Sequence, residues 1–199
     1  RAADAAACDL VFTCLPDDRA LRAALTGPAG AVAAMRAGAI LVEISTVSPE
    51  ASADIARAAE DAGISYLRLP ISGNASIAHT GNLSCFASGP RDAFDRALPV
   101  LEAFTKAQAY LGAGEEARYA KLSVNLMLAA TAVMMGESLA LARRGNIGWQ
   151  DILDVLDNSA AASPMVKYKV GPLGRRDFSS TFSCTQMVKD LDLILGAGH

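Results

Sequence analysis

The sequence predicts an α/β protein in which a doubly wound, largely parallel sheet is followed by an all-helical part. Up to about residue 112, short apolar runs alternate with helical segments of about 10–15 residues, which is typical of β-α units. No strand pattern follows Gly112 and Gly114, and a helix of nearly thirty residues begins near Glu115. We therefore expect a boundary near residue 113, with an α/β domain at 1–113 and a helical domain at 114–199.

The first elements follow from a buried run and an acidic helix start. Residues 9–15 are apolar and stop at Pro16, as expected for a strand buried on both faces. Asp17 and Asp18 suit the N-terminus of a helix that reaches about residue 25, because a carboxylate there accepts from free backbone N–H groups.

The second strand, at residues 38–44, leads to the clearest helix start in the chain. Ser48 is expected as the N-cap and Pro49 as the first residue of a helix through residue 62. The remaining expected elements are strands at residues 64–69, 83–88 and 108–111 and helices at residues 91–104, 149–156 and 185–195.

Composition excludes several classes of partner. Hydrophobic residues make up 52% and charged residues 20% of the chain, and the formal net charge of −3 leaves no basic footprint for nucleic acid. The longest uncharged stretch, Leu122 to Gly136, is shorter than the roughly 18–20 residues that span a bilayer. We expect it to be a buried core helix rather than a membrane span.

The four cysteines show no paired spacing, and histidine is nearly absent, so no disulfide framework and no metal site are expected. Cys14 and Cys85 fall inside predicted strands and are expected to be buried thiols. Reduced cysteines favour the cytoplasm. Residues 1–10 lack the long apolar run of a signal peptide.

A glycine-rich phosphate-binding turn is the piece that the pattern lacks. No Gly-x-Gly-x-x-Gly follows any predicted strand, and the sequence does not begin with Met. We expect a fragment that starts after that turn and that binds a dinucleotide poorly by itself.

Two groups of residues carry chemistry. Lys121 and Asn125 are four residues apart in the long helix, so their polar ends share one face, where an ammonium and an amide can serve proton transfer. Ser72, Gly73 and Asn74 follow a predicted strand in a tight turn, whose N–H groups and hydroxyl suit a carboxylate.

With further residues, these motifs resemble the β-hydroxyacid dehydrogenase family, which includes 3-hydroxyisobutyrate dehydrogenase and relatives of 6-phosphogluconate dehydrogenase. The resemblance covers nearly the whole chain, and its signatures occur in the family's order. They are Leu15-Pro16, Glu43-Ile-Ser-Thr46 before Pro49, Pro70-Ile-Ser-Gly73 with Gly81-Asn-Leu83, Lys121-x-x-x-Asn125, and Phe182 with Lys189-Asp-Leu191.

The resemblance implies a Rossmann domain for NAD or NADP, joined by a long helix to a helical domain that forms homodimers or homotetramers. It implies an active site between the domains and a small carboxylate substrate, a short 3-hydroxy acid or its semialdehyde. By position, Leu15, Pro16 and Thr46 would line the cofactor. Ser72, Gly73 and Asn74 would bind the substrate. Lys121 would be the acid/base with Asn125 beside it, and Lys189 would reach toward cofactor and substrate.

A lysine can take the hydroxyl proton if burial and nearby positive charge lower its pKa from about 10.4 toward neutrality, and Lys189 would supply such a charge. Several positions depart from the family pattern and leave the substrate open. Glu43 and Arg68 replace aspartates, Asn74 replaces a glycine, Glu115 and Ala117 replace glycines, and Leu126 replaces an asparagine.

Two other functions remain open. An imine reductase of the same fold typically lacks the lysine, so Lys121 counts against it. A non-catalytic NAD(P)-binding module would tend to lose the catalytic lysine while keeping the core, so the presence of Lys121 and Lys189 counts against that function too.

Overall fold

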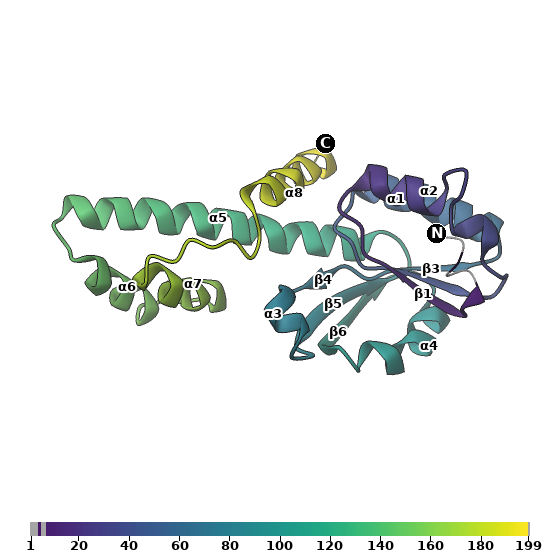
Figure 1. Ribbon diagram of the computed structural model, residues 1–199, viewed down its shortest axis with the longest axis horizontal. Coiled ribbons are helices and arrows are strands. Elements are labelled where there is room, and N and C mark those ends of the chain that lie inside the picture. Colours follow the sequence, from purple (N-terminus) through teal and green to yellow (C-terminus); the bar gives the residue numbers. More distant parts are fainter. Residues whose placement is uncertain (1–3, 5–6, 199) are drawn as a thin grey trace. The chain divides into compact units, whose positions relative to one another are not determined.

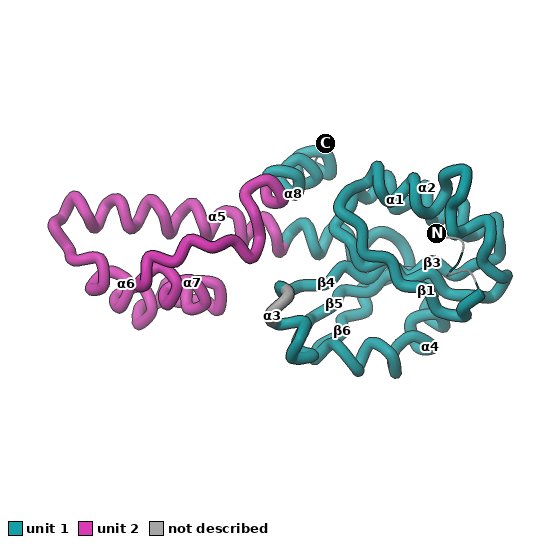
Figure 2. The backbone as a smooth tube through the Cα atoms, viewed as in Figure 1, with its two compact units in different colours: residues 1–123, 188–199 teal, residues 124–187 magenta. Residues whose placement is uncertain are grey.

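The computed structural model describes residues 4 and 7–198 (Figure 1). The first residues of the expected α/β domain and His199 lie outside the described residues. Contacts divide the chain into two compact units (Figure 2). The sheet unit comprises Arg1–Ser123 and Val188–His199, and the helical unit comprises Val124–Met187.

The predicted α/β fold followed by helices is confirmed, and the sheet is mixed. The strands β1 (Leu10–Thr13), β2 (Ile40–Glu43) and β3 (Ser65–Arg68) pair in parallel. Next in the sheet is β5 (Leu83–Ser88), which runs antiparallel to β3. The link between them carries only β4 (Ile71–Ser72) and one helical turn, too little for the crossover that parallel pairing requires.

Two further pairings complete the sheet. The short strand β4 pairs antiparallel with β5, whereas β6 (Thr105–Gly112) pairs in parallel with it. The antiparallel steps in the second half could not be read from the sequence, because an apolar run fits either strand direction.

Helices cover both faces of the sheet (Figure 1). On one face lie α1 (Asp18–Leu25) and α2 (Pro49–Asp61), and on the other lies α4 (Arg91–Leu101). The predicted caps are present. Asp17 accepts a hydrogen bond from the Ala20 N–H at 2.7 Å, and Ser48 accepts one from the Ala51 N–H at 3.0 Å.

Each face has its own apolar core. The core under α1 and α2 is built around Leu21, Leu41 and Ile55, and the core under α4 around Val42, Leu67, Ala87 and Phe94. Alternate residues of each central strand therefore enter opposite cores, which is why these strands read as continuous apolar runs.

Three short elements escaped the sequence analysis: the 3-10 turn Val32–Ala34, β4 and α3 (Ala75–Ala78). A fourth, α7 (Pro164–Gly174), was hidden by Gly171 and Pro172, which usually disfavour helix interiors.

The helical unit consists of most of α5 (Glu116–Arg144) together with α6 (Trp149–Asp157), α7 and the start of α8 (Cys184–Ala197). Its core is small and centres on Met135, Leu153 and Val166. The Trp149 side chain closes it by donating a hydrogen bond from Nε1 to the Leu173 carbonyl at 2.9 Å.

The expectation that residues 122–136 form a buried core helix is wrong. In α5 the side chains of Met127, Val133 and Met134 are 72%, 66% and 66% exposed, because the few helices of this unit cannot cover a helix of 29 residues. By length and composition alone, α5 is long and apolar enough to cross a membrane.

The expectation of a buried Cys14 is also wrong. The strand β1 ends at Thr13, so Cys14 lies in the loop after it and is exposed, whereas Cys85 inside β5 is buried as predicted.

Candidate active site

Two loops meet at the carboxyl edge of the parallel strands. One follows β1 at residues 14–17 and contains Leu15, and the other follows β2 at residues 44–48 and contains Thr46. They are tied together because the Leu15 N–H donates to Ser45 Oγ at 2.7 Å. Folds with parallel strands bind ligands at this edge. We call these segments the β1 loop and the β2 loop.

The same edge carries a polar atom that fits a ligand. The hydroxyl oxygen of Thr13, the last residue of β1, is buried and has no hydrogen-bond partner within the part of the chain that the structure describes. A buried hydroxyl without a partner costs free energy unless a ligand or water satisfies it. The residues present therefore fit a polar cofactor lying along this edge.

A lysine from the end of the chain reaches the β2 loop. The ammonium of Lys189, on α8, donates a hydrogen bond to the Thr46 carbonyl at 2.7 Å across 143 residues of sequence. It also pairs with Asp190, whose carboxylate oxygen lies 2.6 Å away. Asp190 is only 1% exposed and the Lys189 side chain is 29% exposed, so this ion pair is partly buried, unlike the surface pair that a Lys-Asp dipeptide on a helix usually forms.

The charges of Lys189 and Asp190 both affect the pKa of Lys121. Lys121 is 8% exposed, and its pKa is lowered from the ordinary value of 10.5, mainly because burial disfavours the ammonium. The positive charge of Lys189 lowers this pKa further, and the carboxylate of Asp190 opposes the shift. Asn125, one helical turn further along α5, is also buried.

The turn expected to bind the substrate carboxylate follows β4. Because β3 is parallel to β1 and β2, the chain leaves it at the carboxyl edge, and Ser72 and Gly73 come shortly afterwards. Gly73 has φ +139°, and a Cβ there would lie 2.6 Å from the Leu83 side chain. Only glycine fits such a position.

Asn74 has a role that the sequence analysis did not foresee. Its side-chain oxygen accepts a hydrogen bond from the Ile77 N–H at 3.1 Å and so caps the short helix α3. The amide oxygen is thus engaged within the turn, which fits the need for an asparagine or aspartate at a helix start.

Sequence reasoning missed a buried group around Arg118, which precedes Lys121 by three residues on α5. The Arg118 guanidinium is 1% exposed and pairs with the carboxylate of Glu43 at the end of β2. It also donates to Ser52 Oγ at 3.1 Å, to the Ser45 carbonyl at 2.9 Å and to Tyr66 Oη at 3.0 Å. The one available signal was a charged residue placed one turn before the lysine, on the same face of the helix.

A second ion pair joins β3 to the start of α5. Both Nε and Nη2 of Arg68 donate to one carboxylate oxygen of Glu115, and the Arg68 guanidinium lies 4.9 Å from the centre of the Tyr66 ring. Arg68 is therefore bound to Glu115 within the sheet unit. From the sequence, both residues stood out only because they differ from the family pattern. Both arginines contact Tyr66, Arg118 at its hydroxyl and Arg68 at its ring.

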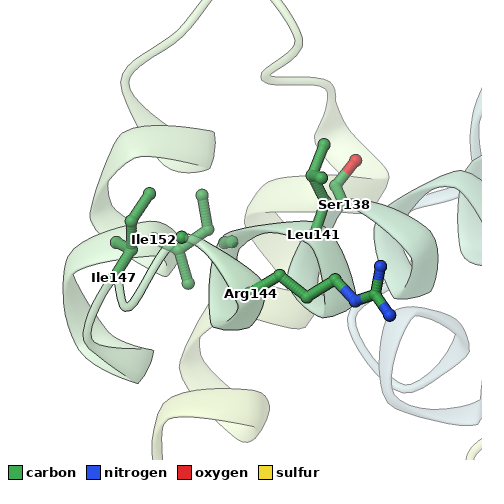
Figure 3. A pocket seen from close by; sticks show the side chains of 7 residues that line it. Ser138, Leu141, Arg144, Ile147 and Ile152 are labelled. Carbon is green, nitrogen blue, oxygen red and sulfur yellow. The ribbon is translucent and has the colours of Figure 1, made fainter.

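One hollow in the helical unit contains none of these residues. It measures about 580 Å³ and lies where α5 ends, lined by Ser138, Leu141, Arg144, Ile147 and Ile152 among others (Figure 3). Its walls are mostly apolar side chains, and the Arg144 guanidinium points away from the two isoleucines (Figure 3). Nothing in it resembles the proton-transfer group of the sheet unit.

Two family models together match the whole chain. Residues 1–112 match the NAD binding domain of 6-phosphogluconate dehydrogenase. Residues 112–199 match the NAD-binding domain of NADP-dependent 3-hydroxyisobutyrate dehydrogenase.

Curated relatives include both an enzyme and a nuclear factor. The chain is 29% identical over 195 residues to 2-(hydroxymethyl)glutarate dehydrogenase of Eubacterium barkeri, covering 98% of this chain and 65% of that protein. It is 28% identical over 191 residues to the cytokine-like nuclear factor N-PAC of Xenopus tropicalis, covering 96% of this chain and 36% of that protein. The chain thus spans less than two thirds of the length of either relative.

Solved structures share the fold. The 3-hydroxyisobutyrate dehydrogenase of Mycobacterium tuberculosis, solved with L-serine, matches with a TM-score of 0.86 and 27% identity over 98% of this chain and 69% of that one. An imine reductase of Streptomyces aurantiacus matches with a TM-score of 0.65 and 25% identity over 88% of this chain and 57% of that one.

Proposed function

Because the chain belongs to the β-hydroxyacid dehydrogenase family, whose cofactor is NAD or NADP, we propose that it is an oxidoreductase acting on a short 3-hydroxy acid or the matching semialdehyde. Lys121 is the proposed acid/base. The observation that carries this proposal is the buried group of Lys121, Lys189 and Asp190 beside the β2 loop, with the pKa of Lys121 lowered by burial and by Lys189.

The proposed chemistry divides between the cofactor and the side chains. Oxidised nicotinamide, when bound, would supply the acceptor for the hydride that leaves the carbon bearing the hydroxyl. Lys121, as the free amine, takes the hydroxyl proton at the same time, so the alcohol loses one hydride and one proton and becomes a carbonyl. In the reverse direction the Lys121 ammonium returns the proton to the oxygen.

The remaining roles follow from the groups present at the edge of the sheet. Leu15, Pro16 and Thr46 line the cofactor, and Lys189 holds the β2 loop through the Thr46 carbonyl. Burial lowers the Lys121 pKa, and the charge of Lys189 partly offsets the opposite effect of Asp190. Asn125, buried one turn beyond Lys121, orients the substrate hydroxyl.

The substrate carboxylate binds at Ser72, Gly73 and Asn74. Charge-assisted hydrogen bonds from backbone N–H groups and a hydroxyl are the strong ones, and Gly73 lets the turn adopt φ +139°, a conformation that a side chain would strain.

The division of labour along the chain is also a proposal. We assign cofactor binding to residues 1–113 and substrate binding and dimerisation to residues 114–199, and the junction of the two family models at residue 112 supports this boundary. The exposed apolar side chains of α5 support a homodimer or homotetramer. The match to 3-hydroxyisobutyrate dehydrogenase extends over α5, which favours a subunit interface and a cytoplasmic enzyme over a membrane span.

Turnover by the full-length protein tests the proposal. Short 3-hydroxy acids are offered with NAD and with NADP, and formation of reduced nicotinamide is followed. We expect Lys121→Met to lower kcat by about 10²–10⁴-fold, because the proton then lacks an acceptor. Cofactor affinity stays within about twofold if the loss belongs to proton transfer alone.

Lys106→Met is the matched control, since Lys106 is an exposed lysine on β6 outside the proposed site. It should leave kcat unchanged. A Lys121→Met variant with full activity would falsify the acid/base role.

One alternative is favoured by a specific observation. The likeness to N-PAC covers 96% of this chain, and a binding module of that kind would need no turnover. Cofactor binding without turnover of any hydroxy acid or imine would support this alternative. Turnover of cyclic imines alone would support an imine reductase.

A further inference from the structure

Arg118 is the largest fully buried side chain of the described residues, and it lies on the turn of α5 just before Lys121. A guanidinium has five N–H donors in a rigid plane, and Arg118 directs them to four acceptors. Two of those acceptors, Glu43 and the Ser45 carbonyl, belong to the end of β2 and the β2 loop. The other two, Ser52 and Tyr66, belong to α2 and β3.

Every polar group of Ser45 is held by this arrangement. Its N–H donates to Glu43 Oε1 at 2.8 Å, and the other oxygen of the same carboxylate accepts from Arg118. Its carbonyl accepts from Arg118, and its hydroxyl accepts from the Leu15 N–H of the β1 loop. A continuous set of hydrogen bonds therefore runs from α5 through Ser45 to both loops.

The bond to the Ser45 carbonyl also orients the next residue. A trans peptide is planar, so its N–H points opposite to its carbonyl, and the described part of the chain holds no cis peptide. Arg118 thereby fixes the direction of the Thr46 N–H, while Lys189 holds the Thr46 carbonyl. The peptide groups before and after Thr46 are thus both held by cationic side chains that come from helices.

We propose that Arg118 is a positioning residue that holds the β1 and β2 loops in register with the turn of α5 that carries Lys121. It acts through Glu43 and Ser45 and touches neither cofactor nor substrate. The inference rests on the proposed function for the role of Lys121, but its effect on the two loops stands on the hydrogen bonds alone.

Arginine is required for this task because of its shape. A lysine in its place keeps the charge but has a single ammonium, which cannot reach four acceptors spread over three elements. The loops would remain folded in Arg118→Lys but would lose their fixed spacing from α5.

The test compares two groups of variants of the full-length protein. Arg118→Lys breaks the path from α5 to both loops, and Ser45→Ala removes its last step, the hydrogen bond that the Leu15 N–H donates to Ser45 Oγ. Tyr66→Phe and Ser52→Ala are matched controls, since each removes one hydrogen bond from the same buried guanidinium outside the loops. For each variant the Kd for NAD and NADP is measured by calorimetry, the melting temperature by circular dichroism, and the pH profile of kcat/KM by turnover.

We expect Arg118→Lys to raise the cofactor Kd at least about tenfold, since small displacements of binding groups are costly. The rise of kcat/KM with pH in the oxidation direction should move to higher pH, because water then reaches Lys121 and the burial that lowers its pKa is reduced. Ser45→Ala should raise Kd in the same direction, and both controls should keep Kd within about twofold whatever their melting temperatures.

An unchanged Kd in Arg118→Lys would overturn the proposal, and so would a control that raises Kd as much as Arg118→Lys does. If the Arg118→Lys variant does not fold, the cofactor Kd of Ser45→Ala is the test. An unchanged Kd in Ser45→Ala would also overturn the proposal. Calorimetry needs no turnover, so a failure of the dehydrogenase proposal, seen as full activity in Lys121→Met, remains distinguishable from a failure of this one.

Discussion

Lys121 is a buried cation whose neighbours bear charges of opposite sign. Burial and Lys189 lower its pKa, whereas Asp190 raises it. If Lys121 is the acid/base proposed above, oxidation needs its free amine, and kcat/KM in that direction should rise with pH as Lys121 loses its proton. The position of this rise on the pH axis therefore reports on the two neighbours.

Substitution of the two neighbours should move the rise in opposite directions. Lys189→Met removes a positive charge and frees Asp190 to act on Lys121 alone, so the Lys121 pKa increases and the rise shifts to higher pH. Asp190→Asn removes the negative charge, so the pKa decreases and the rise shifts to lower pH. The measurement is the pH profile of kcat/KM for each variant.

Asp192→Asn is the control, because Asp192 lies two residues further along α8 and is exposed. Its profile should match that of the unaltered protein. Shifts of the same sign in Lys189→Met and Asp190→Asn would contradict the electrostatic explanation.

Single residues also show how far the site can be read from sequence. Lys121, Asn125 and Lys189 could be proposed because each stands in a motif, although their catalytic roles remain predictions. Asp190 was named only as part of the Lys189-Asp-Leu191 motif, because a helical pattern does not show that its face meets another segment. Arg118 carried no motif at all, and its four acceptors are spread from Glu43 to Tyr66.

At the scale of elements, β3 and α5 are joined by a buried charge pair. The side chains of Arg68 and Glu115 are 8% and 18% exposed, and Glu115 directly precedes the first residue of α5. Together with Arg118 and Glu43, this pair fixes the start of the helix to the ends of two strands. Buried pairs of this kind specify an arrangement more reliably than they add stability.

Breaking this pair from one side should be costly. Arg68→Met leaves the Glu115 carboxylate buried without its cation, and we expect the free energy of unfolding to fall by about 3 kcal/mol. The double variant Arg68→Met with Glu115→Met should recover most of that loss, because no buried charge remains. Urea unfolding of the three proteins measures both changes.

An exposed pair provides the comparison. Arg36 and Asp9 are 60% and 83% exposed, so Arg36→Met should cost less than about 1 kcal/mol. Equal losses in the single and the double variant at Arg68 and Glu115 would show that packing, rather than charge, holds the helix there.

Elements whose ends depend on neighbouring residues were predicted well. Elements that depend on pairing with a strand far away in the sequence were not. Asp17 and Ser48 cap their helices as expected, since a cap needs only the next three residues. The strand β4 has two residues and exists only through its pairing with β5. The direction of β5 likewise depends on how the chain returns to the sheet.

At the scale of the whole molecule, α5 exposes more apolar surface than a helix in water usually does. Val133, Met134 and Leu141 are 66%, 66% and 72% exposed. Contiguous exposed apolar side chains mark a surface that binds another protein or a membrane. We expect a second copy of this chain to cover them.

Light scattering of the full-length protein checks this expectation. The protein should run as a dimer or tetramer, and Met134→Glu should shift it toward monomer, because burying an unpaired carboxylate is costly. The cofactor Kd should stay unchanged, since Met134 belongs to the helical unit and the cofactor loops to the sheet unit. Lys167→Glu, at an exposed site on α7, is the control for added charge. A monomeric unaltered protein would refute the expectation.

The hydrogen bond between Lys189 and Thr46 can form only after both residues have been synthesised, so it also has a place in the order of folding. The two residues are 143 positions apart, and a ribosome adding about 5–20 residues per second needs about 7–29 s to travel from one to the other. During that interval the sheet and its helices can already fold, while the β2 loop waits for its partner. All six strands of the described sheet therefore leave the ribosome before Lys189 does, and the contact of Lys189 with the β2 loop is among the last that the chain can form.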